Sequence, residues 1–185
     1  MKKIRYSVLM LTAAFMMNVS LGQKMMNEKT VEVGGAAMYP SKNIIENAVN
    51  SADHTTLVAA VKAAGLVSML QGAGPFTVFA PTNEAFGRLS NGTVDMLLKP
   101  ESRAKLKGVL TYHVVAGKLD SKALDAAIKK GGKLATVAGG ELLVMKKDGN
   151  YWIKDENGGT AMITIKNVYQ SNGVIHVIDH VLLPK

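Results

Sequence analysis

The sequence contains no cysteine among its 185 residues. This absence excludes a disulfide framework, a thiolate metal site, a cysteine nucleophile and a lipid anchor on cysteine, so packing must stabilise the fold. Charged residues make up only 19% of the chain and hydrophobic residues 48%, which is not the composition of a disordered protein. The length fits one domain of roughly 100 to 200 residues with a short appendage.

The first 22 residues have the pattern of a secretory signal peptide. Lys2, Lys3 and Arg5 form a positive start, Val8–Val19 is mostly apolar, and Ser20–Gly22 supplies the small residues that a signal peptidase requires. The apolar run of about 12 residues is shorter than the roughly 20 that span a bilayer. An uncleaved anchor stays the alternative.

Removal of this signal leaves residues 23–185 with a formal net charge of +5, since three of the excess cations lie in the signal. The remaining lysines are scattered among acidic residues, without a stripe of interleaved aromatics, so nucleic-acid binding is not predicted. Weak attraction to an acidic surface polymer or to membrane headgroups, as a peripheral association with the envelope, stays open. We expect a secreted protein, either periplasmic or extracellular.

Residues 23–43 contain Gly34-Gly35 and Pro40 without sustained periodicity, and we interpret them as a lead-in rather than a core element. The domain is expected over residues 44–185, with a first helix over residues 44–49 and a second over residues 57–64, capped by Thr55 or Thr56. Further helices are predicted over residues 84–88, 94–98, 103–110 and 121–130, and strands over residues 76–80, 134–137, 141–147, 151–154, 162–169 and 174–183.

Two dipeptides, Asp148-Gly149 and Asn172-Gly173, are strong signals for tight hairpin turns between the later strands. The helices thus concentrate in the first half of the domain and the hairpins in the second. This order predicts an α+β fold with a mainly antiparallel sheet.

Three segments resemble the motifs of the fasciclin (FAS1) domain family. Residues 74–86 read GPFTVFAPTNEAF and resemble its first signature, Tyr112-His113 resembles its central motif, and residues 172–184, NGVIHVIDHVLLP, resemble its second signature. The resemblance covers residues 44–185, and the chain resembles the single-copy secreted bacterial forms of the family. It implies a wedge of β-strands with helices packed around it, and a role in adhesion or matrix interaction outside the cell.

The family motifs supply the candidate partner-binding residues. These are Thr82, Asn83, Tyr112, His113, His176, Asp179 and His180. In animal members of the family the Tyr-His motif has been implicated in integrin binding, and the alternative is that Tyr112 and His113 close the edge of the core.

Asp179 has its own structural interpretation. Strand alternation places it on the face of Ile175 and Val177, and His176 on the same face as His180. An acid on an apolar face needs a partner, so we expect a hydrogen bond to backbone amides or to a hydroxyl such as that of Thr82. The alternative is a receptor contact.

No metal or cofactor site is predicted. His176 and His180 have the spacing of helical zinc ligands, but in a strand residues four apart lie about 13 Å from each other and cannot share one ion. The sequence has no G-x-S-x-G elbow, Walker loop, G-x-G-x-x-G fingerprint or paired acid cluster, so we predict that the protein is not an enzyme.

We therefore expect a secreted, non-enzymatic FAS1 module for cell adhesion or for interaction with extracellular matrix or biofilm. Its partner is expected to be a cell-surface or matrix protein or polysaccharide. The alternative is a periplasmic or extracellular module that binds a small hydrophobic ligand or glycan between helices and sheet. A concave pocket with a few convergent polar groups would favour that alternative.

Overall fold

A β-hairpin opens the part of the chain that the computed structural model describes, residues 28–185. Strand β1 (Val31–Val33) pairs antiparallel with β2 (Ala36–Met38), and Gly34 and Gly35 form the turn with φ angles of 57° and 73°. Glycine adopts this left-handed region without strain. The predicted signal peptide lies outside the described residues.

Val33 and Met38 of this hairpin are buried in the main core. The prediction that residues 23–43 hold no core element is therefore wrong. The two strands are only three residues long, too short for their alternation to stand out beside the glycine pair.

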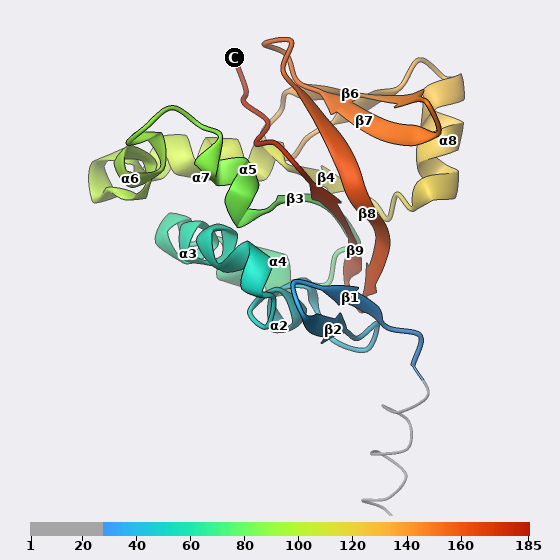
Figure 1. Ribbon diagram of the computed structural model, residues 1–185, viewed down its shortest axis with the longest axis horizontal. Helices are drawn as coiled ribbons and strands as arrows, with labels where there is room; N and C mark the ends of the chain where they lie inside the picture. Colours follow the sequence, from blue (N-terminus) through green and yellow to red (C-terminus); the bar gives the residue numbers. More distant parts are fainter. Residues whose placement is uncertain (1–27) are drawn as a thin grey trace, which may run out of the picture.

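Short helices gather around the hairpin and around one side of the sheet, while the last helix lies beside β6 and β7 (Figure 1). They are α2 (Ile44–Ala48), α3 (Thr55–Ala64), α4 (Val67–Gln71), α5 (Asn83–Gly87), α6 (Thr93–Leu98), α7 (Arg103–Tyr112) and α8 (Ser121–Lys129), with 3-10 turns η1 (Ala52–His54) and η2 (Pro100–Ser102). The N-cap of α3 is His54, so the predicted cap at Thr55 or Thr56 is wrong, and α4 was not predicted. Within residues 28–185 no helix is long and apolar enough to cross a membrane.

Seven strands form one sheet in the order β4-β3-β9-β8-β7-β6-β5. They are β3 (Phe76–Pro81), β4 (Val114–Ala116), β5 (Lys133–Ala135), β6 (Glu141–Lys147), β7 (Asn150–Lys154), β8 (Thr160–Gln170) and β9 (Gly173–Ile178). Neighbours are antiparallel except β3 and β9, which are parallel. The outer strands β4 and β5 meet through a bridge between Val115 and Thr136, so the sheet curls round on itself. The expected α+β class with a mainly antiparallel sheet is confirmed.

Both predicted hairpins are present. Asp148 and Gly149 turn between β6 and β7 with φ angles of 52° and 79°, as a two-residue turn of this type requires. Between β8 and β9 the turn residues are Ser171 and Asn172, because Gln170 pairs with Gly173. A Cβ atom at position 173 would clash with the carbonyl oxygen of Phe76, so only glycine lets β9 lie this close to β3.

The central strands β3 and β9 are buried on both faces and separate two hydrophobic clusters. Val78 and Ala80 of β3 face the cluster beneath α2, α3, α4 and α7. Phe79 faces the second cluster, which α8 covers through Leu124. Continuous burial of these two strands explains why their sequences are mostly apolar rather than alternating, with Thr77 and His176 as buried polar exceptions.

Candidate functional site

Thr82 and Asn83 fix the start of α5. The Thr82 hydroxyl accepts a hydrogen bond from the amide of Ala85 at 3.2 Å, so Thr82 is the N-cap of this helix. The side-chain oxygen of Asn83 accepts from the amide of Thr56 at 2.9 Å, and its nitrogen donates to the carbonyl of Ala52 at 2.8 Å. These bonds hold α5 against the beginning of α3.

Tyr112 is fully buried at the end of α7. Its hydroxyl donates to the carbonyl of Glu141 at 2.8 Å and accepts from the amide of Glu156 at 3.1 Å. One side chain thereby ties α7 to the start of β6 and to the loop after β7. The phenol uses both its donor and an acceptor position inside the protein.

His113 is buried next to it and also uses both polar atoms of its side chain. Nδ1 donates to the carbonyl of Val109 at 2.8 Å, and Nε2 accepts from the amide of Leu182 at 3.0 Å. These two partners define a neutral ring, and burial lowers the pKa of His113 to about 4. The contacts support the interpretation that Tyr112 and His113 close the core; partner contact through them stays a prediction.

His176 lies inside β9 and is buried as well. Its Nε2 donates to the carbonyl of Leu119 at 2.7 Å, and its ring stacks on Phe79 with 5.8 Å between centroids. Burial lowers the pKa of this imidazole. None of the three side chains Tyr112, His113 and His176 therefore offers a surface to a partner in this conformation.

Asp179 and His180 lie beyond the end of β9, which stops at Ile178. The predicted alternation through position 180 is therefore wrong: His180 does not share a face with the buried His176, because its side chain is 45% exposed. Asp179 accepts from the amide of Met162 at 2.7 Å, which confirms the expected bond to a backbone amide. Within residues 28–185 no group of three or more histidine, aspartate or glutamate side chains is placed to hold a metal ion.

The carboxylate of Asp179 also lies 2.9 Å from Nδ1 of His180 and 3.8 Å from the guanidinium of Arg88. Replacing Asp179 with alanine leaves the Met162 amide without its acceptor. We expect Asp179→Ala to reduce the free energy of unfolding by about 1–2 kcal/mol and to lower the melting temperature.

The control for this measurement is Glu84→Ala. Glu84 pairs with the same Arg88 at 2.8 Å, but its side chain is 78% exposed, so an exposed pair of this kind is expected to contribute less than about 1 kcal/mol. Equal melting temperatures for the two variants would show that Asp179 has no structural role.

The fold brings the two long signatures together. β3 and β9 run side by side in parallel, with Phe76 opposite Gly173 and Pro81 opposite Ile178. The central motif joins the same end of the sheet, since His113 binds the backbone of Leu182. The three motifs thus form one structural unit, in which Tyr112, His113 and His176 are buried while Thr82, Asn83, Asp179 and His180 are partly exposed.

A second surface was missed at the level of sequence, and we call it the outer sheet face. Its members are Lys133, Leu143, Met145, Trp152, Lys154 and Met162. In β7 the neighbours Tyr151 and Ile153 are buried, so alternation turns Trp152 to the opposite face, where it is partly exposed. Met145 and Met162 lie directly opposite Trp152 on the two adjacent strands.

Methionine is a flexible apolar side chain that usually fills gaps in cores, but Met145 and Met162 are both partly exposed on this face. The signal that could have found the face is the alternation Tyr-Trp-Ile-Lys over residues 151–154, which groups Trp152 with Lys154. The amide and the carbonyl of Met162 both bind Asp179, so the surface part of the second signature adjoins the outer sheet face.

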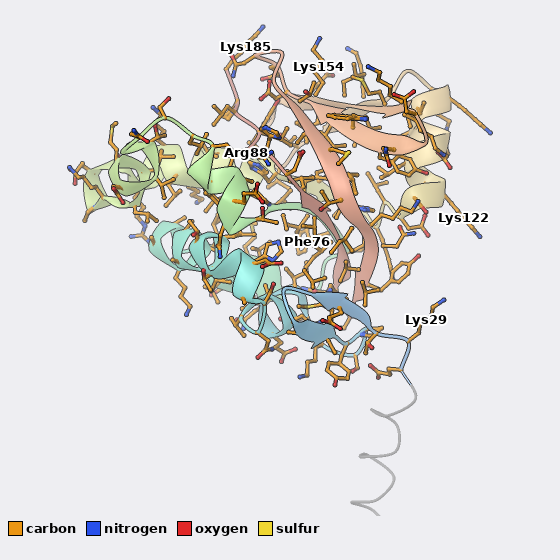
Figure 2. The ribbon with its side chains drawn as sticks, in the orientation of Figure 1. Lys29, Phe76, Arg88, Lys122, Lys154 and Lys185 are labelled. Carbon is orange, nitrogen blue, oxygen red and sulfur yellow. The ribbon has the colours of Figure 1, made fainter. Side chains whose placement is uncertain are left out.

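Lysines border the outer sheet face. Lys133 and Lys154 lie in register on either side of Leu143. Lys133 pairs with Glu141 at 3.0 Å, whereas Lys154 projects into solvent and has no acidic partner within residues 28–185 (Figure 2). The face combines one large aromatic ring with an excess of positive charge.

Comparisons with known proteins show which family has this architecture. The family model of the fasciclin domain matches residues 52–184. Protein sll1483 of Synechocystis sp. is 45% identical over 169 residues, which cover 91% of this chain and 88% of that protein. The cell surface glycolipoprotein MPB83 of Mycobacterium bovis is 34% identical over 119 residues, or 64% of this chain and 48% of that protein.

Two animal proteins are also similar. The transforming growth factor-beta-induced protein ig-h3 of Sus scrofa is 33% identical over 134 residues, 70% of this chain but only 17% of that protein. The solved FAS1 domain pair from the insect cell adhesion molecule Fasciclin I superposes with a TM-score of 0.70 at 18% identity, over 85% of this chain and 58% of that chain. This likeness confirms the expected FAS1 fold. The chain belongs to the fasciclin (FAS1) domain family, whose domains are non-enzymatic modules of the adhesion type.

Proposed function

We propose that the protein is a secreted, non-enzymatic binding module that acts in adhesion or in an extracellular matrix or biofilm, and that its partner is an acidic polysaccharide of the cell surface. The family supports the general role, since its members include a cell surface glycolipoprotein and a cell adhesion molecule. The predicted signal peptide supports export.

The observation that carries the proposal is the position of Trp152 on the outer sheet face. A flat aromatic ring, in register between two methionines, offers a platform on which the apolar face of a sugar ring can stack. The lysines beside it attract the carboxylates of an acidic polymer. Helix α8 covers the opposite face of these strands, where Leu124 packs with Leu142, so the platform itself stays open.

Some of the candidate residues from the family motifs lie near the platform, whereas others are occupied by bonds within the fold. Asp179 adjoins the platform through the backbone of Met162, and His180 lies beside Asp179, so a long polymer could reach them from Trp152. Thr82 and Asn83 already use their side chains to hold α5 in place. We therefore centre the binding surface on the outer sheet face and not on the motifs.

Trp152→Ala is expected to weaken binding to the acidic polysaccharide isolated from the producing cells by at least about tenfold, because large aromatic side chains at the centre of an interface contribute most of its affinity. The melting temperature should change little, since the ring is partly exposed. Affinity is measured by calorimetry at low salt. Lys154→Gln should weaken binding less and make it less sensitive to salt.

The matched control is Met96→Ala on α6, which removes an exposed apolar side chain far along the chain from this face; Met96 is 56% exposed. It should bind like the unmodified protein. Unchanged affinity of Trp152→Ala would contradict the proposal, and so would binding that requires surface proteins, abolished by protease treatment of the cells and absent from the purified polysaccharide.

A further inference from the structure

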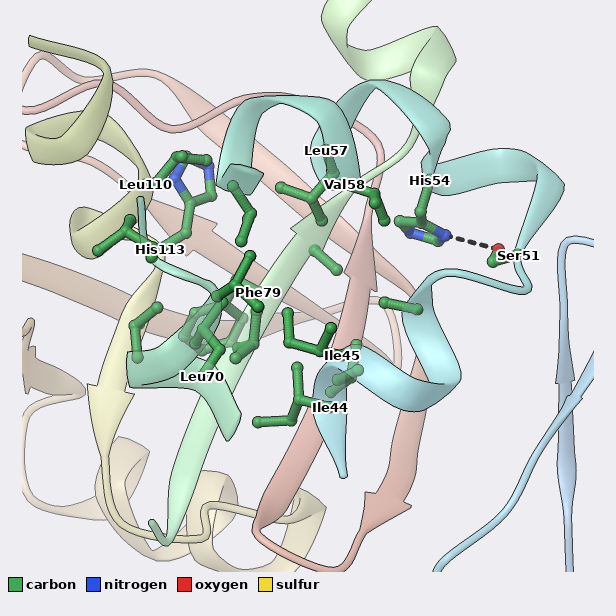
Figure 3. A pocket seen from close by; sticks show the side chains of 18 of the residues that line it. Ile44, Ile45, Ser51, His54, Leu57, Val58, Leu70, Phe79, Leu110 and His113 are labelled. Atoms are coloured by element: carbon green, nitrogen blue, oxygen red, sulfur yellow. Dashed lines mark hydrogen bonds between the residues drawn. The ribbon is translucent and has the colours of Figure 1, made fainter. Parts of the chain in front are cut away.

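A cavity of about 80 Å³ lies between the helices and the sheet (Figure 3). Apolar side chains of α2, α3 and α4 line one wall and those of β3 and β9 the other; examples are Ile44, Leu57, Leu70 and Val78. This volume holds roughly five or more water-sized atoms, at about 10–15 Å³ for each. It is smaller than the roughly 300 Å³ of common ligand pockets, so it restricts any occupant to a single small ring or a short chain.

One buried polar atom at this cavity has no hydrogen-bond partner. His54, which lines the cavity, is only 4% exposed, and its Nδ1 lies 2.9 Å from the hydroxyl of Ser51 (Figure 3). Its Nε2 is the one buried side-chain nitrogen or oxygen within residues 28–185 that makes no hydrogen bond. The backbone carbonyl of Ala80 acts to raise the pKa of the ring, but its position does not meet the geometry of a hydrogen bond to Nε2.

The unpaired ring nitrogen of His54 is an exception among the buried histidines. His113 uses both ring nitrogens, and so does His176, which accepts from the amide of Asn167 and donates to Leu119. An unpaired buried polar group costs roughly 1–3 kcal/mol in a folded protein. Burial dominates at His54 and lowers its pKa, so the ring is neutral at pH 7.

The surroundings of the cavity limit the chemistry of an occupant. His54 is the N-cap of α3, and Val58 and Lys62 follow it at four-residue spacing along that helix. The ammonium-bearing Lys62 is exposed. The polar lining residues are Ser51, His54, Lys62 and His113. The Ser51 hydroxyl is paired with His54, and both ring nitrogens of His113 are paired, so Nε2 of His54 is the buried polar atom available to an occupant. An occupant there must be uncharged and mainly apolar, with one group that can pair with the ring.

We propose that this cavity is a binding site for a small, uncharged, largely apolar molecule that carries one hydroxyl group, and that the hydroxyl hydrogen-bonds to Nε2 of His54. A hydroxyl suits either tautomer of the ring, because it can donate or accept. The site lies in the helix-covered core, away from the outer sheet face, and the inference is independent of the polysaccharide proposal.

Phenol and benzene are the probes, since they share a ring and differ by one hydroxyl. We expect the full chain to bind phenol about three- to tenfold more tightly than benzene, which is the effect of one net hydrogen bond. The imidazole nitrogen resonances of His54 should shift on addition of phenol and much less on addition of benzene. In His54→Phe the preference for phenol should disappear while benzene still binds.

Two further variants keep the test decisive. His180→Phe makes the same change at an exposed histidine and should leave the preference intact. Ala48→Leu fills the cavity from α2 and should abolish binding of both probes. This variant tests the cavity even in the case that His54→Phe does not fold. The inference is overturned if neither probe binds, if benzene binds as tightly as phenol, or if Ala48→Leu leaves the binding of phenol unchanged.

Discussion

Lowering the pH from 6.5 to 4 is expected to remove about 3 kcal/mol of stability through His113 alone. Burial lowers the pKa of this ring from 6.5 to about 4 in the folded protein, whereas the unfolded chain keeps the ordinary value. Above pH 6.5 the ring is neutral in both states. As the pH falls toward 4, only the unfolded chain takes up the proton, so the free energy of unfolding decreases.

Acidification is expected to decrease the free energy of unfolding through His54 and His176 as well, because burial also lowers the pKa values of these two rings. The contribution of His113 is isolated by comparing urea unfolding of the protein and of His113→Phe at several pH values. The variant leaves the carbonyl of Val109 and the amide of Leu182 unpaired, so it should be less stable at pH 7, and its stability should depend less on pH. Parallel pH profiles for the two proteins would contradict the assignment.

Asn172→Ala is expected to cost at least about 3 kcal/mol, because one side chain serves three buried backbone groups. Its oxygen accepts from the amide of Ile44 at 3.0 Å, and its nitrogen donates to the carbonyls of Leu70 and Gly72 at 2.7 and 2.8 Å. These bonds join the start of α2 and the end of α4 to the hairpin turn before β9. Alanine leaves all three groups without a partner.

Asn157→Ala is the matched control for this loss. Asn157 is an exposed asparagine whose side chain donates to the carbonyls of Leu183 and Pro184 at 2.8 and 3.0 Å, where water can replace it. Its replacement should cost less than about 1 kcal/mol by chemical denaturation. A loss at Asn172 no larger than that at Asn157 would show that the turn does not depend on these hydrogen bonds.

Much of the fold follows from local sequence. The Thr82 cap and the turn at Asp148-Gly149 are formed by neighbouring residues, so they could be predicted without knowledge of the rest of the chain. The β1–β2 hairpin could not, because three-residue strands have too little periodicity, and its stability comes from the burial of Val33 and Met38 in a distant core.

The candidate site depends more strongly on contacts between distant residues. Burial of Tyr112 and His113 results from bonds to Glu141 and Leu182, which the local motif does not reveal. The parallel pairing of β3 with β9 joins segments about 100 residues apart. Because β9 stops at Ile178, strand alternation could not place His180 correctly.

The cavity was foreseen only as an alternative. Its apolar lining residues look like ordinary core positions in the sequence, and nothing local marks His54 as different from the other histidines. Only the three-dimensional arrangement shows that Nε2 of His54 lacks a partner while His113 and His176 are satisfied.

The central claim is that the family motifs maintain the fold while binding takes place on the outer sheet face. The most direct test measures the affinity of His113→Phe and Trp152→Ala for the isolated acidic polysaccharide, under conditions in which both variants are folded. We predict that folded His113→Phe binds like the unmodified protein and that Trp152→Ala does not. Loss of binding in folded His113→Phe, with binding retained in Trp152→Ala, would contradict the claim.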